Sequence, residues 1–168
     1  MFIQRKQQKI IYILRGEYSV IIKQLRDCPQ FIDTVIDWLN DEFGDINSRN
    51  FYKGIIEHSL IKDGIPITFV AVEHDLLLGT IGIWRGDLLS RQELYPWLSA
   101  LVVHPDYRKS GIGQKLQNYV LEYCTSKSIK ELYLYTELKG YYEKSGWEQF
   151  DSGYEYTGNE VCIYKHSL

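Results

Sequence analysis

The residues with the clearest chemical potential form a glycine-containing segment in the second half of the chain. Arg108-Lys109-Ser110-Gly111-Ile112-Gly113 follows the apolar run Leu101-Val102-Val103 and opens an amphipathic pattern of helical period. Glycines at a helix start let backbone N–H groups approach a ligand closely, and these free N–H groups favour an anion. Arg108 and Lys109 add positive charge, so the segment predicts a pyrophosphate-binding site.

Two common phosphate-binding patterns do not fit this segment. The pattern Gly-x-x-x-x-Gly-Lys-[Ser/Thr] of nucleoside triphosphate sites does not occur, and Leu116 stands where the third glycine of a dinucleotide fingerprint belongs. On its own, the segment is better explained as a glycine-rich helix start with two solvated bases. A second motif is needed to decide between these readings.

That second motif is Tyr141-Tyr142-Glu143-Lys144-Ser145-Gly146-Trp147, about thirty residues further on. The pair resembles the two signatures of the GNAT superfamily of acyl-CoA N-acyltransferases. Arg108, Gly111 and Gly113 fit [Arg/Gln]-x-x-Gly-x-[Gly/Ala], and the later segment fits [Phe/Leu]-Tyr-x-x-x-Gly-[Phe/Trp/Tyr]. The resemblance runs from about Tyr18 to the C-terminus, which gives a single domain over residues 17–168. Residues 1–16 are an N-terminal extension, either a tail or an extra strand.

The resemblance implies acetyl-CoA as co-substrate and Tyr142 as the general acid that protonates the departing thiolate, with Tyr141 packing inward. It also implies that backbone N–H groups hold the pyrophosphate and that one strand splays from its neighbour to expose its backbone to the pantetheine arm. The implied cofactor residues are Leu101, Val102, Val103, Arg108, Lys109, Ser110, Gly111, Ile112 and Gly113. The connection before Tyr142 is about one residue shorter than is usual in the family.

Candidate acceptor contacts cluster before the cofactor strand, with one after the following strand. They are Trp84, Asp87, Glu93, Tyr95, Trp97 and Glu137. An acidic and aromatic rim would suit a cationic amine. The three acids are also candidates for the general base, and so is a water chain. Polyamines, aminoglycosides, amino acids and protein N-termini all remain open as acceptors.

The elements that must position these residues follow from hydrophobic period and turn signals. Strands are expected at 18–25, 66–72, 77–84, 97–103, 131–136, 147–156 and 161–165, and a polar loop at 86–95. Helices are expected after Pro29 up to Gly44, at 49–59, from Ile112, and as a short piece ending at Gly146. The expected fold is α/β (α+β). A mixed central sheet of about six or seven strands has helices on both faces and a V-shaped splay between its central strands.

Composition narrows the function class. The 168 residues carry a net charge of -3, which argues against a nucleic-acid partner. No stretch has the length of a membrane span, and three scattered cysteines and four scattered histidines predict no metal site. We expect a cytoplasmic N-acetyltransferase that moves an acetyl group from acetyl-CoA to a primary amine of a small molecule or peptide by direct attack. The family resemblance is compatible with a homodimer. The alternative is a non-catalytic acyl-CoA-binding or regulatory module on the same fold.

Overall fold

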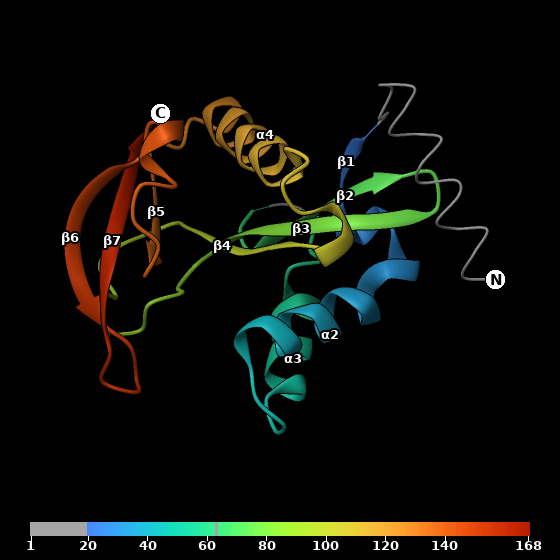
Figure 1. The fold of residues 1–168 in the computed structure, drawn as a ribbon, viewed down its shortest axis with the longest axis horizontal. Coiled ribbons are helices and arrows are strands. Elements are labelled where there is room, and N and C mark those ends of the chain that lie inside the picture. Colours follow the sequence, from blue (N-terminus) through green and yellow to red (C-terminus); the bar gives the residue numbers. More distant parts are fainter. Residues whose placement is uncertain (1–19, 63) are drawn as a thin grey trace.

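The computed structural model describes residues 20–62 and 64–168, so the predicted N-terminal extension lies outside the described residues. They form one mixed sheet in the order β1-β2-β3-β4-β5-β7-β6 (Figure 1). The strands are β1 Ile21–Gln24, β2 Ile67–Glu73, β3 Leu76–Trp84, β4 Trp97–Val103, β5 Glu131–Thr136, β6 Glu148–Tyr154 and β7 Glu160–Ser167. Every strand predicted within this part of the chain is present.

Helices cover both faces of the sheet, as predicted. Helices α2 (Ile32–Phe43) and α3 (Arg49–His58) lie on one face of β1–β4, and α4 (Ile112–Ser126) lies on the other (Figure 1). The short helix expected before Gly146 is a 3-10 turn, Glu143–Ser145, which ends where Gly146 adopts a φ of 81°. None of the described helices has the length and apolar character of a membrane span.

The core is divided by the sheet. Leu98, Leu116 and Leu134 belong to the cluster beneath α4, whereas Val70, Trp84 and Val102 pack against α2 and α3. A third cluster has no helix over it. There, Leu88 and Leu94 from the β3–β4 loop cover Trp97, Tyr133, Val161 and Ile163. The loop predicted as polar therefore contributes buried side chains of its own.

The central strands β4 and β5 separate after a single pairing. Trp97 pairs with Tyr133, and the Tyr133 amide donates to the Pro96 carbonyl at 3.0 Å. Further along β4, Ala100 adopts a φ of 56°, and the β3–β4 register shifts there. This is a β-bulge, which places two β4 residues opposite one residue of β3 and bends the strand. The predicted V-shaped splay is therefore present, and the bulge lies at its origin.

Candidate active site

The segment predicted to hold pyrophosphate forms the start of α4. Gly111 is the N-cap with a φ of 85°, and Lys109 also adopts a positive φ of 61°. The first intrahelical bond is the Lys115 amide to the Gly111 carbonyl at 3.0 Å, so the amides of Ile112, Gly113 and Gln114 lack an intrahelical acceptor. Consecutive amides in this conformation form a concave anion site, which a phosphate ester fits.

The side chain of Arg108 does not point freely into this site. Its Nε donates to the Val103 carbonyl at 3.1 Å, and its guanidinium pairs with Glu42 of α2 at 2.9 Å. These contacts tie the end of β4 to α2. Arg108 therefore braces the strand, and part of its charge is neutralised by Glu42. It also occupies one of the carbonyl groups expected to be free for the pantetheine arm.

Of the two tyrosines in the second motif, Tyr142 is buried and Tyr141 is exposed, whereas Tyr141 was predicted to pack inward. Tyr142 is the buried one, packed within the α4-side cluster against Trp147 and Tyr164. Burial raises the pKa of Tyr142 to about 12. Tyr141 is 43% exposed, and its hydroxyl would lie 3.3 Å from a Cβ added at Gly113. The expectation that Tyr141 packs inward was wrong, and Tyr141 instead borders the α4 start.

Asp87 lies on the face of the sheet opposite Tyr142. It interacts with residues from β4, α3 and β5. Part of the residue is exposed, but its carboxyl is desolvated, which raises the pKa of Asp87 to about 6. The Ser99 hydroxyl of β4 faces the carboxyl and partly offsets this shift. The Asp87 charge also raises the pKa of Tyr52 in α3 and of Tyr135 in β5, adding to the larger effect of burial on both.

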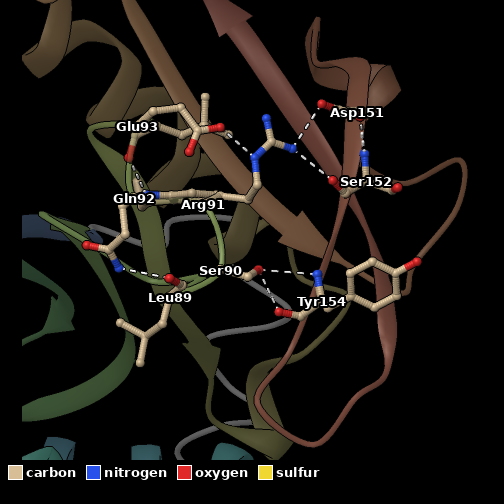
Figure 2. Close-up of polar contacts among 10 residues, drawn as sticks. Leu89, Ser90, Arg91, Gln92, Glu93, Asp151, Ser152 and Tyr154 are labelled. Atoms are coloured by element: carbon tan, nitrogen blue, oxygen red, sulfur yellow. Dashed lines mark hydrogen bonds and ion pairs between the residues drawn. The ribbon is translucent and has the colours of Figure 1, made fainter.

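The β3–β4 loop that carries Asp87 is tied to β6 by Arg91, as Figure 2 shows. The guanidinium pairs with Asp151 at 2.9 Å and with Glu93 at 2.6 Å, and it donates to the Ser152 carbonyl at 2.8 Å. Ser90 adds two hydrogen bonds with the backbone of Tyr154. The apolar underside fits as closely, since a Cβ added at Gly153 would lie 2.6 Å from Leu88. We call residues 85–96 the strap, because they join β3 to β4 and are bound to β6.

The remaining predicted acceptor residues are not gathered at one point. Trp97 is fully buried, and its indole N–H donates to the Leu94 carbonyl at 2.7 Å, so it packs beneath the strap. Glu93 is exposed and paired with Arg91, which lowers its pKa. Glu137 is exposed in the segment after β5. The acidic rim of Asp87 with Glu93 therefore reduces to Asp87.

Trp84 and Tyr95 lie near an open groove beside Asp87. The groove measures about 450 Å³ and runs between α3 and the end of β3. Its lining includes Phe51, Ile55, Trp84 and Arg85. The Arg85 guanidinium lies 6.0 Å from the ring centre of Tyr95, which is half-exposed. The lining also includes Gly86, the residue before Asp87.

Comparison with known proteins identifies this arrangement. A family model described as the acetyltransferase (GNAT) family matches residues 32–147. The chain belongs to the GNAT acetyltransferase family. The match spans both signature segments, which lie at the start of α4 and in the turn before β6.

Solved GNAT structures share the fold. An aminoglycoside 6'-acetyltransferase type Ii is 26% identical over 88% of this chain and 96% of its own, with a TM-score of 0.65. An aminoglycoside 6'-N-acetyltransferase complexed with coenzyme A is 20% identical, with the same coverage and a TM-score of 0.67. The NatC complex bound to Gag peptide and CoA contains a chain that is 16% identical over 89% of this chain and 98% of its own, with a TM-score of 0.66. The comparison with curated proteins gives no match.

Several residues of this GNAT site were not predicted from sequence. Ser99 had a signal, because it is a polar residue within the apolar strand Trp97-Leu98-Ser99-Ala100-Leu101. No sequence signal marked the other three residues, Tyr52, Arg91 and Tyr135. Their relation to Asp87 or to β6 depends on contacts between distant parts of the chain. Among the described residues, no group of three or more His, Cys, Asp or Glu side chains could hold a metal ion.

Proposed function

We propose that this GNAT protein transfers the acetyl group of acetyl-CoA to a primary amine by direct attack. One observation carries the proposal. β4 and β5 pair only at Trp97 and Tyr133, so the rest of the β4 edge that faces β5 is not paired with that strand. This edge lies between the start of α4 and the cluster that holds Tyr142. The Leu101 and Val102 backbone would pair with the pantetheine arm as an added strand, and the residues from Lys109 to Gly113 would hold the pyrophosphate.

Tyr142 would protonate the departing thiolate. In the reaction the amine nitrogen bonds to the carbonyl carbon, the C–S bond breaks, and the CoA sulfur takes the phenol proton. With a pKa of about 12, Tyr142 keeps that proton at every working pH. The same low-polarity surroundings also destabilise the CoA thiolate and so raise the pKa of its thiol. The pKa of the thiol therefore comes closer to that of Tyr142. Solvent then returns a proton to the phenolate.

A covalent acyl-enzyme is disfavoured by the cysteines. Cys28 and Cys124 are buried, and burial raises the pKa of both thiols, that of Cys124 to about 12. Thiols that hold their protons so firmly are poor nucleophiles. Cys162 is partly buried in β7, where it is opposite Thr136 of β5 and Ser152 of β6. This position is away from the start of α4. This favours a ternary complex in which acceptor and acetyl-CoA are bound together.

The acceptor we favour is an amino acid or a peptide N-terminus. The groove beside Asp87 contains Arg85, a cation that attracts a carboxylate and repels a polycation. The NatC complex, one chain of which shares this fold, is bound to a peptide, whereas two other neighbours are aminoglycoside acetyltransferases. An aminoglycoside therefore remains the second candidate, on the strength of the 26% identical neighbour.

The test is release of CoA thiol from acetyl-CoA in the presence of three acceptor classes: an amino acid and its amide, a polyamine, and an aminoglycoside. We expect turnover with at least one amine, and a lower KM for the free amino acid than for its amide. Mass spectrometry of the product identifies the acetylated nitrogen. Tight acetyl-CoA binding without turnover on any amine would instead support the non-catalytic module.

A further inference from the structure

The face of the sheet opposite Tyr142 contains a buried hydroxyl without a partner, beside a desolvated carboxyl. Ser99 is 3% exposed, and among the described residues its hydroxyl has no hydrogen-bond partner. A buried polar group without a partner costs free energy, so its presence needs an explanation. The Asp87 carboxyl faces this hydroxyl closely enough for the hydroxyl to lower its pKa, but the pair does not have the full geometry of a hydrogen bond. A donor placed between them would satisfy both.

The strand register fixes the side on which this pair lies. Ser99 is opposite Gly82, and Trp97 is opposite Trp84, so Ser99, Trp97 and Trp84 lie on one face of the sheet, the face that α2 and α3 cover at Trp84. Leu98, between them, lies in the α4-side cluster that also contains Tyr142. Tyr135 is likewise on the opposite face of β5 from Leu134. Asp87 and Tyr142 therefore approach the splay from opposite faces of the sheet.

The groups that interact with Asp87 come from three elements. Ser99 comes from β4, Tyr52 from α3 and Tyr135 from β5, while Arg85 and the Arg91–Glu93 pair belong to its own loop. The negative charges of Asp45 and Glu155 also raise the pKa of Tyr52 and of Tyr135, respectively. Both phenols keep their protons at neutral pH, because their pKa values are raised above the ordinary value of 10. The charge-changing group at the centre of this cluster is Asp87.

We propose that Asp87 and Ser99 form the seat of the acceptor amine, with Asp87 as the proton acceptor and Ser99 as a hydrogen-bond partner that orients the nitrogen. The inference rests on the proposed acetyl transfer and assigns the base that it requires. The acceptor ammonium donates one proton to the Asp87 carboxylate, and the freed nitrogen lone pair attacks the thioester carbonyl. The second proton leaves the nitrogen as the amide forms and passes to solvent.

The arrangement gives each proton its own side of the reaction. The groove between α3 and the end of β3 reaches Gly86, the residue before Asp87, and would admit the amine on this face. The thiolate leaves on the α4 side, where Tyr142 lies. A base and an acid on opposite faces cannot neutralise each other by direct contact, so both keep the protonation state that the reaction needs. The strap, which carries Asp87, is fixed to β6 through Arg91 (Figure 2).

The experiment compares kcat/KM for the acceptor across pH 5 to 9 in the wild type, Asp87→Asn, Asp87→Glu and Ser99→Ala. In the wild type, kcat/KM rises through a pKa of about 6 and then levels off. In Asp87→Asn we expect a fall of about 100-fold at pH 7, typical for removal of a general base. Its kcat/KM continues to rise with pH, because only spontaneously deprotonated amine reacts. Asp87→Glu restores the levelling, and Ser99→Ala falls by about tenfold, the range of one hydrogen bond to a charged group.

Two readouts keep the outcomes separate. Acetyl-CoA affinity, measured by calorimetry, stays unchanged in all four proteins and shows that each is folded. Asp75→Asn makes the same chemical change in the exposed β2–β3 turn, at the other end of β3, and leaves kinetics unchanged. If the wild type acetylates an amine and Asp87→Asn keeps its rate and its pH profile, the seat is wrong while the acetyl transfer stands. If the wild type acetylates no amine, the proposed function itself fails.

Discussion

The two ends of the splay between β4 and β5 are built in different ways. At the α4 end, the candidate phosphate site is one continuous segment, Lys109 to Gly113, and its ligands are backbone amides. At the other end, Asp87, Ser99, Tyr52 and Tyr135 come from a loop, two strands and a helix. Local geometry suffices for the first, whereas the second exists only when the whole sheet is assembled.

This difference has a consequence for what each end can vary. A backbone cradle binds a phosphate ester with little dependence on side-chain identity, apart from the glycines. A site made of side chains from separate elements changes with any one of them. We infer that the α4 end supplies the constant part of the chemistry and that the Asp87 end sets which amine is accepted.

The largest expected effect is at Tyr142. Tyr142→Phe removes the proton donor without changing the shape of the core, so kcat should fall by about 100-fold or more, the range of a general acid. Acetyl-CoA affinity should stay the same, as calorimetry would measure. Tyr156→Phe, on a fully exposed side chain, is the matched control. If Tyr141→Phe lowers kcat and Tyr142→Phe does not, the roles of the two tyrosines are exchanged.

The second prediction concerns stability at the Asp87 end. The folded-state pKa of Asp87 is about 6, above its ordinary value of 3.8, so the protonated form is favoured by folding. Its stabilising contribution is complete below pH 3.8 and is lost as pH rises through 6. Asp87→Asn keeps a neutral group, so it should be more stable than the wild type at pH 8, by up to about 3 kcal/mol at 1.36 kcal/mol per pKa unit.

Urea unfolding of both proteins at pH 4, 6 and 8 measures this difference. The advantage of Asp87→Asn should shrink toward pH 4. Glu93→Gln is a control of opposite sign, because Arg91 lowers the pKa of Glu93 and its contribution is lost as pH falls. A constant difference between Asp87→Asn and wild type at all three pH values would mean that the Asp87 carboxyl is not desolvated.

The third prediction tests the cradle. A methyl group added in Gly113→Ala would lie 3.3 Å from the Tyr141 hydroxyl and 3.7 Å from Val103. It would also cover the amide that a phosphate approaches, so the Kd for acetyl-CoA should rise about tenfold, or 1.4 kcal/mol. At saturating acetyl-CoA, kcat should be retained. Adding Tyr141→Phe gives the methyl group room. A defect that disappears in this double variant would therefore come from crowding and not from lost access to the backbone.

What the sequence could predict follows the same division between local and distant contacts. Neighbouring residues encode the strands along the chain, the helix start at Ile112 and the turn at Gly146. All of these predicted features are present. Tyr141 was misplaced because its neighbour Tyr142 takes the only buried position, beside Trp147. The loop at 86–95 looked polar because Arg91, Glu93 and Ser90 are polar, yet Arg91 and Ser90 have partners in β6, about sixty residues away. Hydrophobic period carries no information about such pairs.

The smallest effect should come from that strap. Arg91 is 19% exposed and makes two ion pairs and a hydrogen bond to the Ser152 carbonyl, so Arg91→Ala should cost about 1 kcal/mol and lower Tm by about 2–4 °C. Because the strap carries Asp87, kcat/KM for the acceptor should fall about threefold, the size of a change below 1 kcal/mol. The Kd for acetyl-CoA should not change. Lys165→Ala removes an ion pair between β7 and β5 without crossing the splay, and it should leave the acceptor kinetics unchanged. Equal losses of kcat/KM in both variants would show that Arg91 acts through general stability, whereas a loss confined to Arg91→Ala places the control of the acceptor end in the strap.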